Sequence, residues 1–384
     1  MTNQIYLDNA ATTQADKEVV KAMLPYFSEK YGNASSAHLL GIEARKAVEE
    51  SRAIIAKSIG ALPEEIIFTS SGTEANNLAL KGIAWNSGKK HIVTTKIEHD
   101  CILKVCKWLE TQGFKVTYLN VDSEGFVNMG ELKENITKDT ALVSVIYGNN
   151  EIGTIQNIEE IGKICREKGV YFHTDACQSY MKIPIDVSKQ NLDLVTLNAH
   201  KVHGPKGVGA LYIKRGINLT PLMHGGGQEK ELRSGTENVA GIVGFAKAVQ
   251  IAKKQDLEKM INLRDTLIKE ILKIPDTKLN GAVGEHRLCN NVNISFSNVE
   301  GESIGGFLSD YGICISTGSA CSSKSLQASH VLTAIGLDAL EANSSIRISL
   351  SRFNNEKEID KFIKVLPIVI KRLRAISPFA REKK

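Results

Sequence analysis

The chain has 384 residues, 42% of them hydrophobic, and a formal net charge of +5. This length and composition predict a globular protein of two or three domains and exclude a disordered chain. The charge is mild and no dense basic block precedes the short run 381–384, which argues against nucleic-acid binding. No apolar run approaches the length of a membrane span, so we expect no membrane partner. The seven cysteines form no CxxC pair, which favours neither disulfides nor a metal site and predicts a reducing, cytoplasmic setting.

Helical and strand-like segments alternate from about residue 17 to residue 214. Helical spacing covers residues 19–23, 42–55 and 73–83. Apolar strands are expected at residues 66–68, 92–93, 116–119, 142–147, 171–174, 194–197 and 210–213. This alternation predicts an α/β fold with a mostly parallel seven-stranded sheet between helices.

The last third of the chain has a different pattern. A long apolar-periodic stretch from residue 241 to residue 274 predicts one helix that leaves the large domain. Strands at 292–296 and 346–350, with helices at 327–335 and 357–373, then predict a smaller α+β domain. We expect a large domain over residues 15–260 and a small domain built from residues 1–14 and 261–384.

A glycine-containing turn joins the strand at 66–68 to the helix that follows. Ser71-Gly72-Thr73 opens that helix, and its free backbone N–H groups suit a phosphate. The alternative is simple N-capping by Thr73, which holds whether or not a phosphate binds.

Two later strand ends carry polar residues at the edge where open α/β sheets bind ligands. Asp175 and Gln178 follow the strand at 171–174, and a carboxylate there could pair with a protonated pyridine nitrogen or merely cap a turn. Asn198, His200 and Lys201 follow the strand at 194–197, where the lysine could form a Schiff base with an aldehyde cofactor or lie in a solvated loop. Aspartate and lysine together fit pyridoxal phosphate (PLP) better than either does alone.

Across nearly its whole length the sequence resembles the fold-type I PLP enzymes of the class-V aminotransferase family, and more narrowly the NifS/IscS-type cysteine desulfurases. The motifs that carry the resemblance are Tyr6-Leu7-Asp8-Asn9-Ala10-Ala11-Thr12-Thr13, Gly32-Asn33-Ala34-Ser35-Ser36-Ala37-His38, the Gly72 turn, Glu98-His99, Asn149-Asn150-Glu151-Ile152-Gly153, the Asp175 and Lys201 segments, Arg233-Ser234-Gly235-Thr236, Ser319-Ala320-Cys321 and Ser344-Ser345-Ile346-Arg347.

The resemblance implies a role for each motif residue. PLP would be held covalently by Lys201, with Asp175 on its pyridine nitrogen, His99 stacked on its ring, and Gln178 and Asn150 near its hydroxyl. Gly72, Thr73 and His200 would bind its phosphate, together with Thr236 from a partner subunit, which implies a homodimer. The family has Ser or Thr where this chain has Asn198, which would contact the phosphate through its amide. Arg347, with Asn150 beside it, would bind the substrate carboxylate.

Cys321 lies among small polar residues that offer nothing for a buried thiol to pack against. A thiol on such a segment could approach the substrate, and the resemblance makes Cys321 the nucleophile that accepts sulfur. Lys201 and His99 would complete the catalytic set as proton carriers. Cys177, beside Asp175, is the nearest rival thiol.

The resemblance therefore implies conversion of L-cysteine to L-alanine with a persulfide on the enzyme. The sulfur would go to an iron–sulfur scaffold or another acceptor protein, for cluster assembly or tRNA thiolation. A selenocysteine lyase or another PLP-dependent β-lyase is the alternative within the same fold. A non-catalytic scaffold of a sulfur pathway is the alternative from another class, and the intact Lys201, Asp175, His99 and Cys321 disfavour it.

Overall fold

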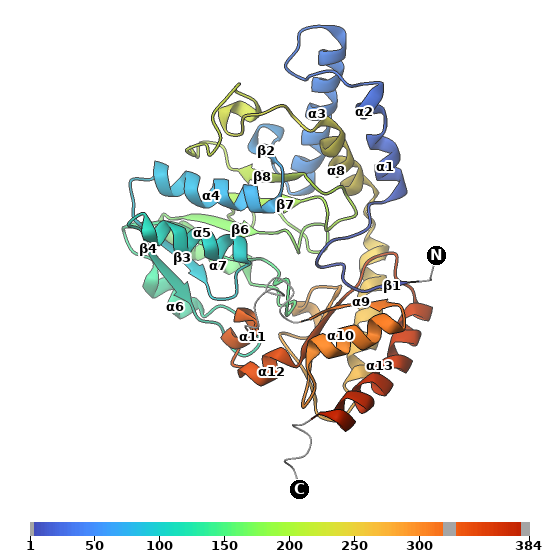
Figure 1. The fold of residues 1–384 in the computed structure, drawn as a ribbon. Coiled ribbons are helices and arrows are strands. Elements are labelled where there is room, and N and C mark those ends of the chain that lie inside the picture. Colours follow the sequence, from blue (N-terminus) through green and yellow to red (C-terminus); the bar gives the residue numbers. More distant parts are fainter. Residues whose placement is uncertain (1–3, 318–327, 378–384) are drawn as a thin grey trace.

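The computed structural model describes residues 4–317 and 328–377. Within these ranges the larger sheet has seven strands in the order β2-β8-β7-β6-β5-β3-β4 (Figure 1). Its strands are β2 (Ile66–Thr69), β3 (His91–Thr95), β4 (Lys115–Leu119), β5 (Thr140–Ser144), β6 (Tyr171–Asp175), β7 (Leu194–Asn198) and β8 (Gly209–Ile213). The pairs on both sides of β8 are antiparallel and the others are parallel. The expected mostly parallel seven-stranded sheet is confirmed.

Helices cover both faces of this sheet, because alternate strand residues bury apolar side chains on each side. On one face Phe68 and Val195 share an apolar cluster with residues of five helices. These are α1 (Lys17–Met23), α3 (Leu39–Ser58), α6 (Met129–Asn135), α7 (Ile158–Lys168) and α8 (Val239–Ile251). On the other face Ile67 and Leu194 pack against α4 (Gly72–Asn86) and α5 (Asp100–Thr111). The short helix α2 (Pro25–Ser28) extends from α1.

A second sheet forms the centre of a smaller α+β unit. Its strands are antiparallel, in the order β12-β13-β10-β9: Ser316–Thr317, Ser345–Ser349, Asn291–Phe296 and Thr277–Leu279. Three helices, α9 (Lys254–Ile271), α10 (Gly301–Asp310) and α13 (Glu356–Ile376), pack their apolar faces on this sheet (Figure 1). Two short helices, α11 (His330–Ala334) and α12 (Ala339–Asn343), lie between α10 and α13 in the sequence. The helix expected at 327–335 is therefore shorter, since Ser329 caps it and it begins at His330.

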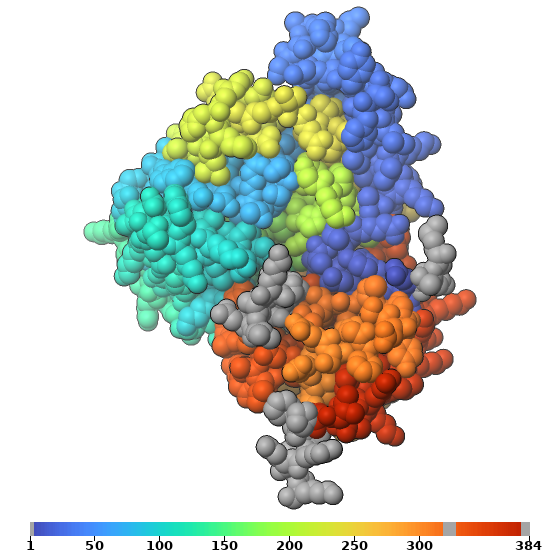
Figure 2. All heavy atoms as spheres, in the orientation of Figure 1, coloured from blue at the N-terminus to red at the C-terminus, as the bar shows by residue number. Residues whose placement is uncertain are grey.

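The first residues of the chain belong to the same small unit. Strand β1 (Ile5–Tyr6) pairs in parallel with β11 (Ile313–Cys314). Ile5 and Leu7 are buried in the apolar cluster of α9, α10 and α13. In the space-filling view the dark blue N-terminal segment lies against the orange residues of the C-terminal third (Figure 2). Both ends of the chain thus contribute to one core.

The single helix expected from residue 241 to residue 274 is wrong. The structure has two helices, α8 and α9, separated by Ala252 and Lys253 in extended conformations (ψ of 135° and 145°). The apolar residues of α8 face the large sheet, whereas those of α9 face the small one. One straight helix could not bury both sets, so the chain changes direction between them.

No helix in the described ranges is both long enough and apolar enough to cross a membrane.

Candidate active site

A cavity of about 270 Å³ lies where β6 and β7 end and α4 and α5 begin. Because the carboxyl ends of parallel strands share one edge of the sheet, this edge gathers residues that are far apart in the sequence. The cavity is lined by Ala10, Ala11, Ser71, Gly72, Thr73, Asn76, His99, Cys101, Ile146, Asn150, Asp175, Cys177, Gln178, Asn198, His200, Lys201 and Arg347. Nearly all the site residues expected from the sequence are therefore brought together.

Asp175 is the buried anion of this cavity. Its carboxylate accepts hydrogen bonds from the Asn76 side-chain amide at 2.7 Å and from the Cys177 backbone N–H at 2.8 Å. Burial by itself would raise the pKa of Asp175, but nearby His99 and these hydrogen bonds hold it below its usual value. A carboxylate that stays ionised here could stabilise a protonated ring nitrogen of a bound ligand.

His99 caps the N-terminus of α5 and also borders the cavity. Its Nδ1 accepts a hydrogen bond from the backbone N–H of Cys101 at 3.2 Å. Burial and the nearby positive charge of Lys201 lower the pKa of His99, so the imidazole is neutral near pH 7. The helix-capping role and the cavity-lining role thus coexist in one residue.

The N-terminus of α4 provides the cavity with backbone N–H groups. Ser71 is the N-cap, and its hydroxyl accepts from the N–H of Glu74, which leaves the N–H groups of Gly72 and Thr73 directed beyond the helix end. A Cβ at position 72 would lie 2.5 Å from the Cys177 sulfur, so only glycine fits. This end of the cavity suits an anion such as a phosphate.

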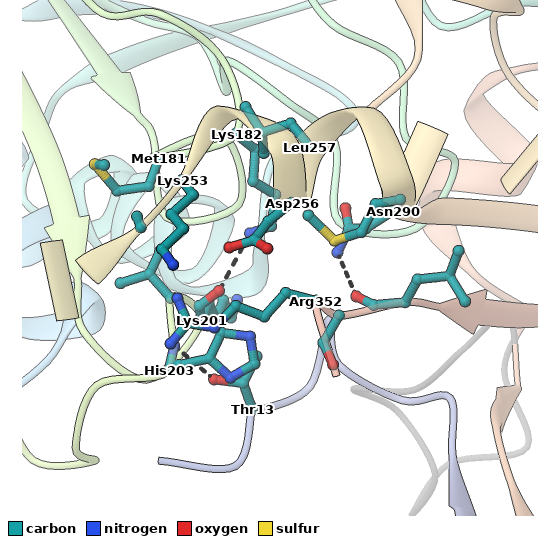
Figure 3. Close-up of a pocket in the computed structure, with 15 residues that line it drawn as sticks. Thr13, Met181, Lys182, Lys201, His203, Lys253, Asp256, Leu257, Asn290 and Arg352 are labelled. Carbon is teal, nitrogen blue, oxygen red and sulfur yellow. Dashed lines mark hydrogen bonds between the residues drawn. The ribbon is translucent and has the colours of Figure 1, made fainter. Parts of the chain in front are cut away.

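Lys201 lies in the turn after β7, and contacts behind the cavity fix the backbone of this turn. The buried ammonium of Lys182 donates to the carbonyl oxygens of Gln178 and Lys201 at 3.0 and 3.2 Å. Burial lowers the pKa of Lys182 to about 8. Lys182 and Lys201 also line a separate small cavity of about 50 Å³, whose residues are drawn in Figure 3. Lys201 therefore borders both cavities, and its main-chain carbonyl is held by Lys182.

His200 and Gln178 connect the site to the N-terminal segment. The His200 imidazole contacts the hydroxyl of Thr12 at 3.2 Å, and burial lowers its pKa to about 4. The Gln178 side chain donates to the carbonyl oxygen of Ala10 at 2.9 Å. Residues 10–12 therefore form a wall of the cavity.

Arg347 is almost fully buried at the small-domain side of the cavity, with 2% of its surface exposed. Its Nη2 pairs with Asp8 at 2.9 Å, and its Nη1 donates to the Asn150 carbonyl oxygen at 3.1 Å. Its Nε has no hydrogen-bond partner among the described residues. A buried guanidinium with an unused N–H is suited to a ligand carboxylate.

Three further buried polar atoms border the cavity without a partner in the described ranges, the side-chain oxygens of Asn76, Asn150 and Asn198. Buried polar atoms that lack protein partners indicate a polar ligand. An ionised carboxylate, a lysine, an imidazole, a helix N-terminus and unpaired amides together match the groups of PLP: a pyridine nitrogen, an aldehyde, a ring and a phosphate. The residues present fit this cofactor.

Two of the expected residues are absent from this set of lining residues, for different reasons. Thr236 is exposed and does not line the cavity of its own chain. Cys321 lies outside the described residues. The described segments on both sides of it contact Arg347, which lines the cavity, and Glu98, which precedes His99. Thr317 and Ser316 pair with Ile346 and Arg347, and the imidazole of His330 donates to the Glu98 carbonyl oxygen at 2.9 Å.

The rival thiol, Cys177, is a poor nucleophile in this structure. It is 7% exposed, and burial and the charge of Asp175 raise its pKa well above the usual value. Cys101 is a second thiol in the cavity, and burial raises its pKa to about 12. Both sulfurs are therefore protonated at neutral pH.

Sequence reasoning gave no site role to the polar residues Asn76 and Cys101 in the cavity or to Asp8 at its border, although Asp8 belongs to one of the motifs above. Helical spacing could have found Asn76, since it lies one turn after Thr73 on α4 and projects toward the same end. No described group of three or more His, Cys, Asp or Glu residues is arranged to hold a metal ion.

The comparisons with known proteins show which family and fold the chain shares. The family model described as Aminotransferase class-V matches residues 5–362. The chain is 50% identical to a protein of Dictyoglomus turgidum named "Cysteine desulfurase IscS", over 100% of this chain and 98% of the relative. It is 51% identical to a protein of the same name from Clostridium botulinum, over 98% and 97% of the two chains.

Two solved structures have the same fold. One, described as "NIFS-LIKE PROTEIN", superposes with a TM-score of 0.91 at 42% identity, covering 96% of this chain and all of that one. Another, described as "SspA in complex with cysteine", has a TM-score of 0.83 at 40% identity, covering 91% of this chain and all of that one. These likenesses confirm the expected fold type. The chain belongs to the class-V aminotransferase family and, within it, to the NifS/IscS-type cysteine desulfurases.

Proposed function

We propose that this protein is a PLP-dependent cysteine desulfurase in which Lys201 binds the cofactor covalently and Cys321 accepts the sulfur of L-cysteine. The observation that carries the proposal is the meeting of Lys201, Asp175 and His99 in one cavity. Arg347 also lines this cavity, and it pairs with Ser316 on the strand that leads toward Cys321. The relatives named as cysteine desulfurases, and the structure described as a complex with cysteine, support the same substrate.

Bound PLP supplies an electron sink for the α-carbon of an amino acid. The residues of this chain then have distinct tasks. Asp175 would stabilise a proton on the ring nitrogen, while Gly72 and Thr73 would donate backbone N–H groups to the phosphate, together with His200 and Asn198. Gln178 and Asn150 would hold the hydroxyl side of the ring.

The substrate carboxylate binds to Arg347, whose Nε has no protein partner among the described residues. The amine of Lys201 removes the proton from the substrate Cα. The Cys321 thiolate attacks the substrate sulfur; a sulfur–sulfur bond forms, the bond from sulfur to Cβ breaks, and the carbon takes up a proton to leave alanine. Atoms balance, because one cysteine and one thiol give one alanine and one persulfide.

The position of Cys321 in the chain is compatible with this task. It follows Thr317 by four residues, and four residues span at most about 14 Å. Thr317 and Ser316 pair with the strand that carries Arg347. After the segment, Ser329 donates to the buried Glu151 carboxylate at 2.5 Å, next to Asn150.

We further propose that the enzyme is a homodimer whose Thr236 contacts the phosphate in the partner's site. The exposure of Thr236, and its absence from its own cavity, support this arrangement. The acceptor of the persulfide would be an iron–sulfur scaffold or another thiol protein in the cytoplasm. The divisions at residues 14/15 and 260/261 are proposed as the domain boundaries.

Borohydride reduction of the PLP-loaded protein, followed by peptide mapping, tests the cofactor linkage. We expect label on Lys201 and none after Lys201→Ala, whereas Lys206→Ala, at an exposed lysine in the same turn, should label normally. Label on another lysine in the wild-type protein would refute the assignment.

The sulfur step is tested with Cys321→Ser and, as matched control, Cys177→Ser. Addition of L-cysteine should perturb the visible absorption of both variants, because neither change removes Lys201. Alkylation and mass spectrometry should find a persulfide in the control but not in Cys321→Ser. Alanine formation at the wild-type rate by Cys321→Ser would show that another group accepts the sulfur.

A further inference from the structure

The thiol of Cys101 contacts His99 and Asn76 inside the cavity, and the proposed reaction gives it no task. Its sulfur lies 3.0 Å from Nδ1 of His99 and 3.0 Å from the side-chain nitrogen of Asn76. The backbone N–H of the same residue donates to His99 Nδ1 at 3.2 Å. The thiol and the backbone N–H of Cys101 therefore both contact Nδ1 of His99.

The hydrogen-bonding capacity of these groups determines where the protons lie. A backbone N–H can only donate, so Nδ1 of His99 must present its lone pair and carries no proton. The Asn76 amide nitrogen also donates, so the Cys101 sulfur accepts from Asn76 and directs its own S–H at Nδ1. The proton of the neutral imidazole is then on Nε2.

The thiol has to remain protonated for this arrangement to hold. The surroundings favour protonation, since the Cys101 side chain is largely buried and Asp175 places a negative charge nearby. The same Asn76 nitrogen that contacts the sulfur also donates to Asp175 at 2.7 Å. The thiol therefore belongs to a connected set that runs from His99 through Cys101 and Asn76 to Asp175.

We propose that Cys101 is a positioning residue that holds His99 in its Nε2–H tautomer, so that the ring acts as a neutral hydrogen-bond donor in the cavity. The imidazolium carries a proton on Nδ1 as well as on Nε2. The proton on Nδ1 would point at two other donors, the backbone N–H and the S–H of Cys101, and would break both hydrogen bonds. Any effect of this tautomer on catalysis rests on the proposed function. The assignment of the tautomer itself does not.

Other groups around His99 also influence its titration. Lys201 and His330 disfavour the charged ring, whereas Asp175 and Asp100 favour it. None of these groups is altered when Cys101 is replaced. A shift in the titration midpoint of His99 that appears only when Cys101 is replaced can therefore be assigned to Cys101.

The experiment measures the ring of His99 directly, by ¹⁵N NMR of histidine-labelled protein freed of cofactor, with His99→Gln to assign the signal. Wild-type protein should show an unprotonated Nδ1 and a protonated Nε2. Cys101→Ala should raise the titration midpoint of His99 by about one pH unit, the equivalent of one lost hydrogen bond. Cys101→Ser, which restores a donor, should return the midpoint toward the wild-type value.

Cys106→Ala serves as the control for packing, because Cys106 is buried on the same helix but does not line the cavity. It should leave the His99 midpoint unchanged. A proton on Nδ1 in the wild-type protein, or equal midpoints in wild type and Cys101→Ala, would overturn the proposal.

A kinetic arm separates this proposal from the proposed function. With L-cysteine as substrate, the acid limb of the pH profile of kcat/KM should move with the His99 midpoint in Cys101→Ala and not in Cys106→Ala. If desulfurase activity is absent, the NMR result still decides the role of Cys101. If activity is present and depends on Cys321 but neither the midpoint nor the acid limb moves, the Cys101 proposal fails alone.

Discussion

The side-chain amide of Asn76 donates a 2.7 Å hydrogen bond to the carboxylate of Asp175, and both groups are buried. The two residues come from different layers, since Asn76 lies on α4 and Asp175 ends β6. This bond links the helix whose N-terminus suits a phosphate to the strand whose carboxylate suits a ring nitrogen. It therefore fixes the spacing between the two ends of the cavity.

Replacement of Asn76 by alanine should weaken the protein without cofactor. The variant leaves Asp175 without one of its donors, and hydrogen bonds to buried charges contribute about 1.5–3 kcal/mol. Urea unfolding should show a loss of this size for Asn76→Ala and a much smaller one for Asn77→Ala, whose amide makes only a local bond to the Thr73 carbonyl oxygen. Equal losses in the two variants would contradict this account.

Arg347→Lys should impair the binding of L-cysteine more than the binding of PLP. A lysine cannot keep the contacts with Asp8 and Asn150 and also offer a planar pair of N–H groups to a carboxylate. A loss of about 1.5–3 kcal/mol corresponds to a KM raised roughly 10- to 150-fold. Steady-state kinetics give KM, with Arg352→Lys as control because Arg352 pairs with Asp16 away from the cavity. An unchanged KM in Arg347→Lys would exclude this arginine as the carboxylate site.

Glu229 anchors the segment that leads to Thr236, and its removal should be costly. Its carboxylate accepts from both terminal nitrogens of Arg52 at 2.8 Å and from the Phe68 backbone N–H at 2.7 Å. Glu229→Ala leaves a buried guanidinium without this partner, and such losses reach about 3–5 kcal/mol. Glu43→Ala, which breaks an exposed pair with Lys30, should cost far less, because solvent screens exposed ion pairs. Similar midpoints of urea unfolding for the two variants would count against a structural role for Glu229.

His173 should make the protein less stable as the pH falls below about 6.5. The ring is fully buried between the hydroxyls of Ser144 and Thr196, and burial lowers its pKa to about 4. Between pH 6.5 and 4 the unfolded chain binds a proton that the folded protein excludes, so the free energy of unfolding falls with pH. The contribution of this group over that window is about 3 kcal/mol.

Urea unfolding at a series of pH values checks this prediction. His173→Gln should be less stable at pH 7 but should have a smaller loss between pH 6.5 and 4 than the wild type. His286→Gln, at an exposed histidine, should retain the wild-type slope. A slope that does not change in His173→Gln would mean that other groups cause the acid sensitivity.

The sequence was most informative where local chemistry determines local structure. Apolar runs such as residues 194–197 predicted the strands of the large sheet, because strands covered on both faces are continuously apolar. Strand ends then predicted where Asp175 and Lys201 would lie. The site followed because the fold brings strand ends to one edge.

Other features depend on contacts that sequence spacing does not reveal. The break between α8 and α9 arises because the two helices face different cores, and sequence spacing does not show which core each helix faces. The pair of Arg52 and Glu229 joins residues 177 positions apart, and neither has a local pattern that indicates a partner. The role of Cys101 needs the positions of both His99 and Asn76 in space.

The joining of the two chain ends in one core has a consequence for synthesis on the ribosome. The backbone N–H of Ala10 bonds to the hydroxyl of Ser349, a residue 339 positions later. The segment of residues 5–12 emerges early, yet its strand partner β11 and the bonding partners on β13 are made more than 300 residues later. The large sheet can form while translation continues, but the wall of the cavity made by residues 10–12 waits for the C-terminal third. Such long-range closure is slow, so the nascent chain depends on residues of β11 and β13 to complete a binding site that residues 10–12 begin.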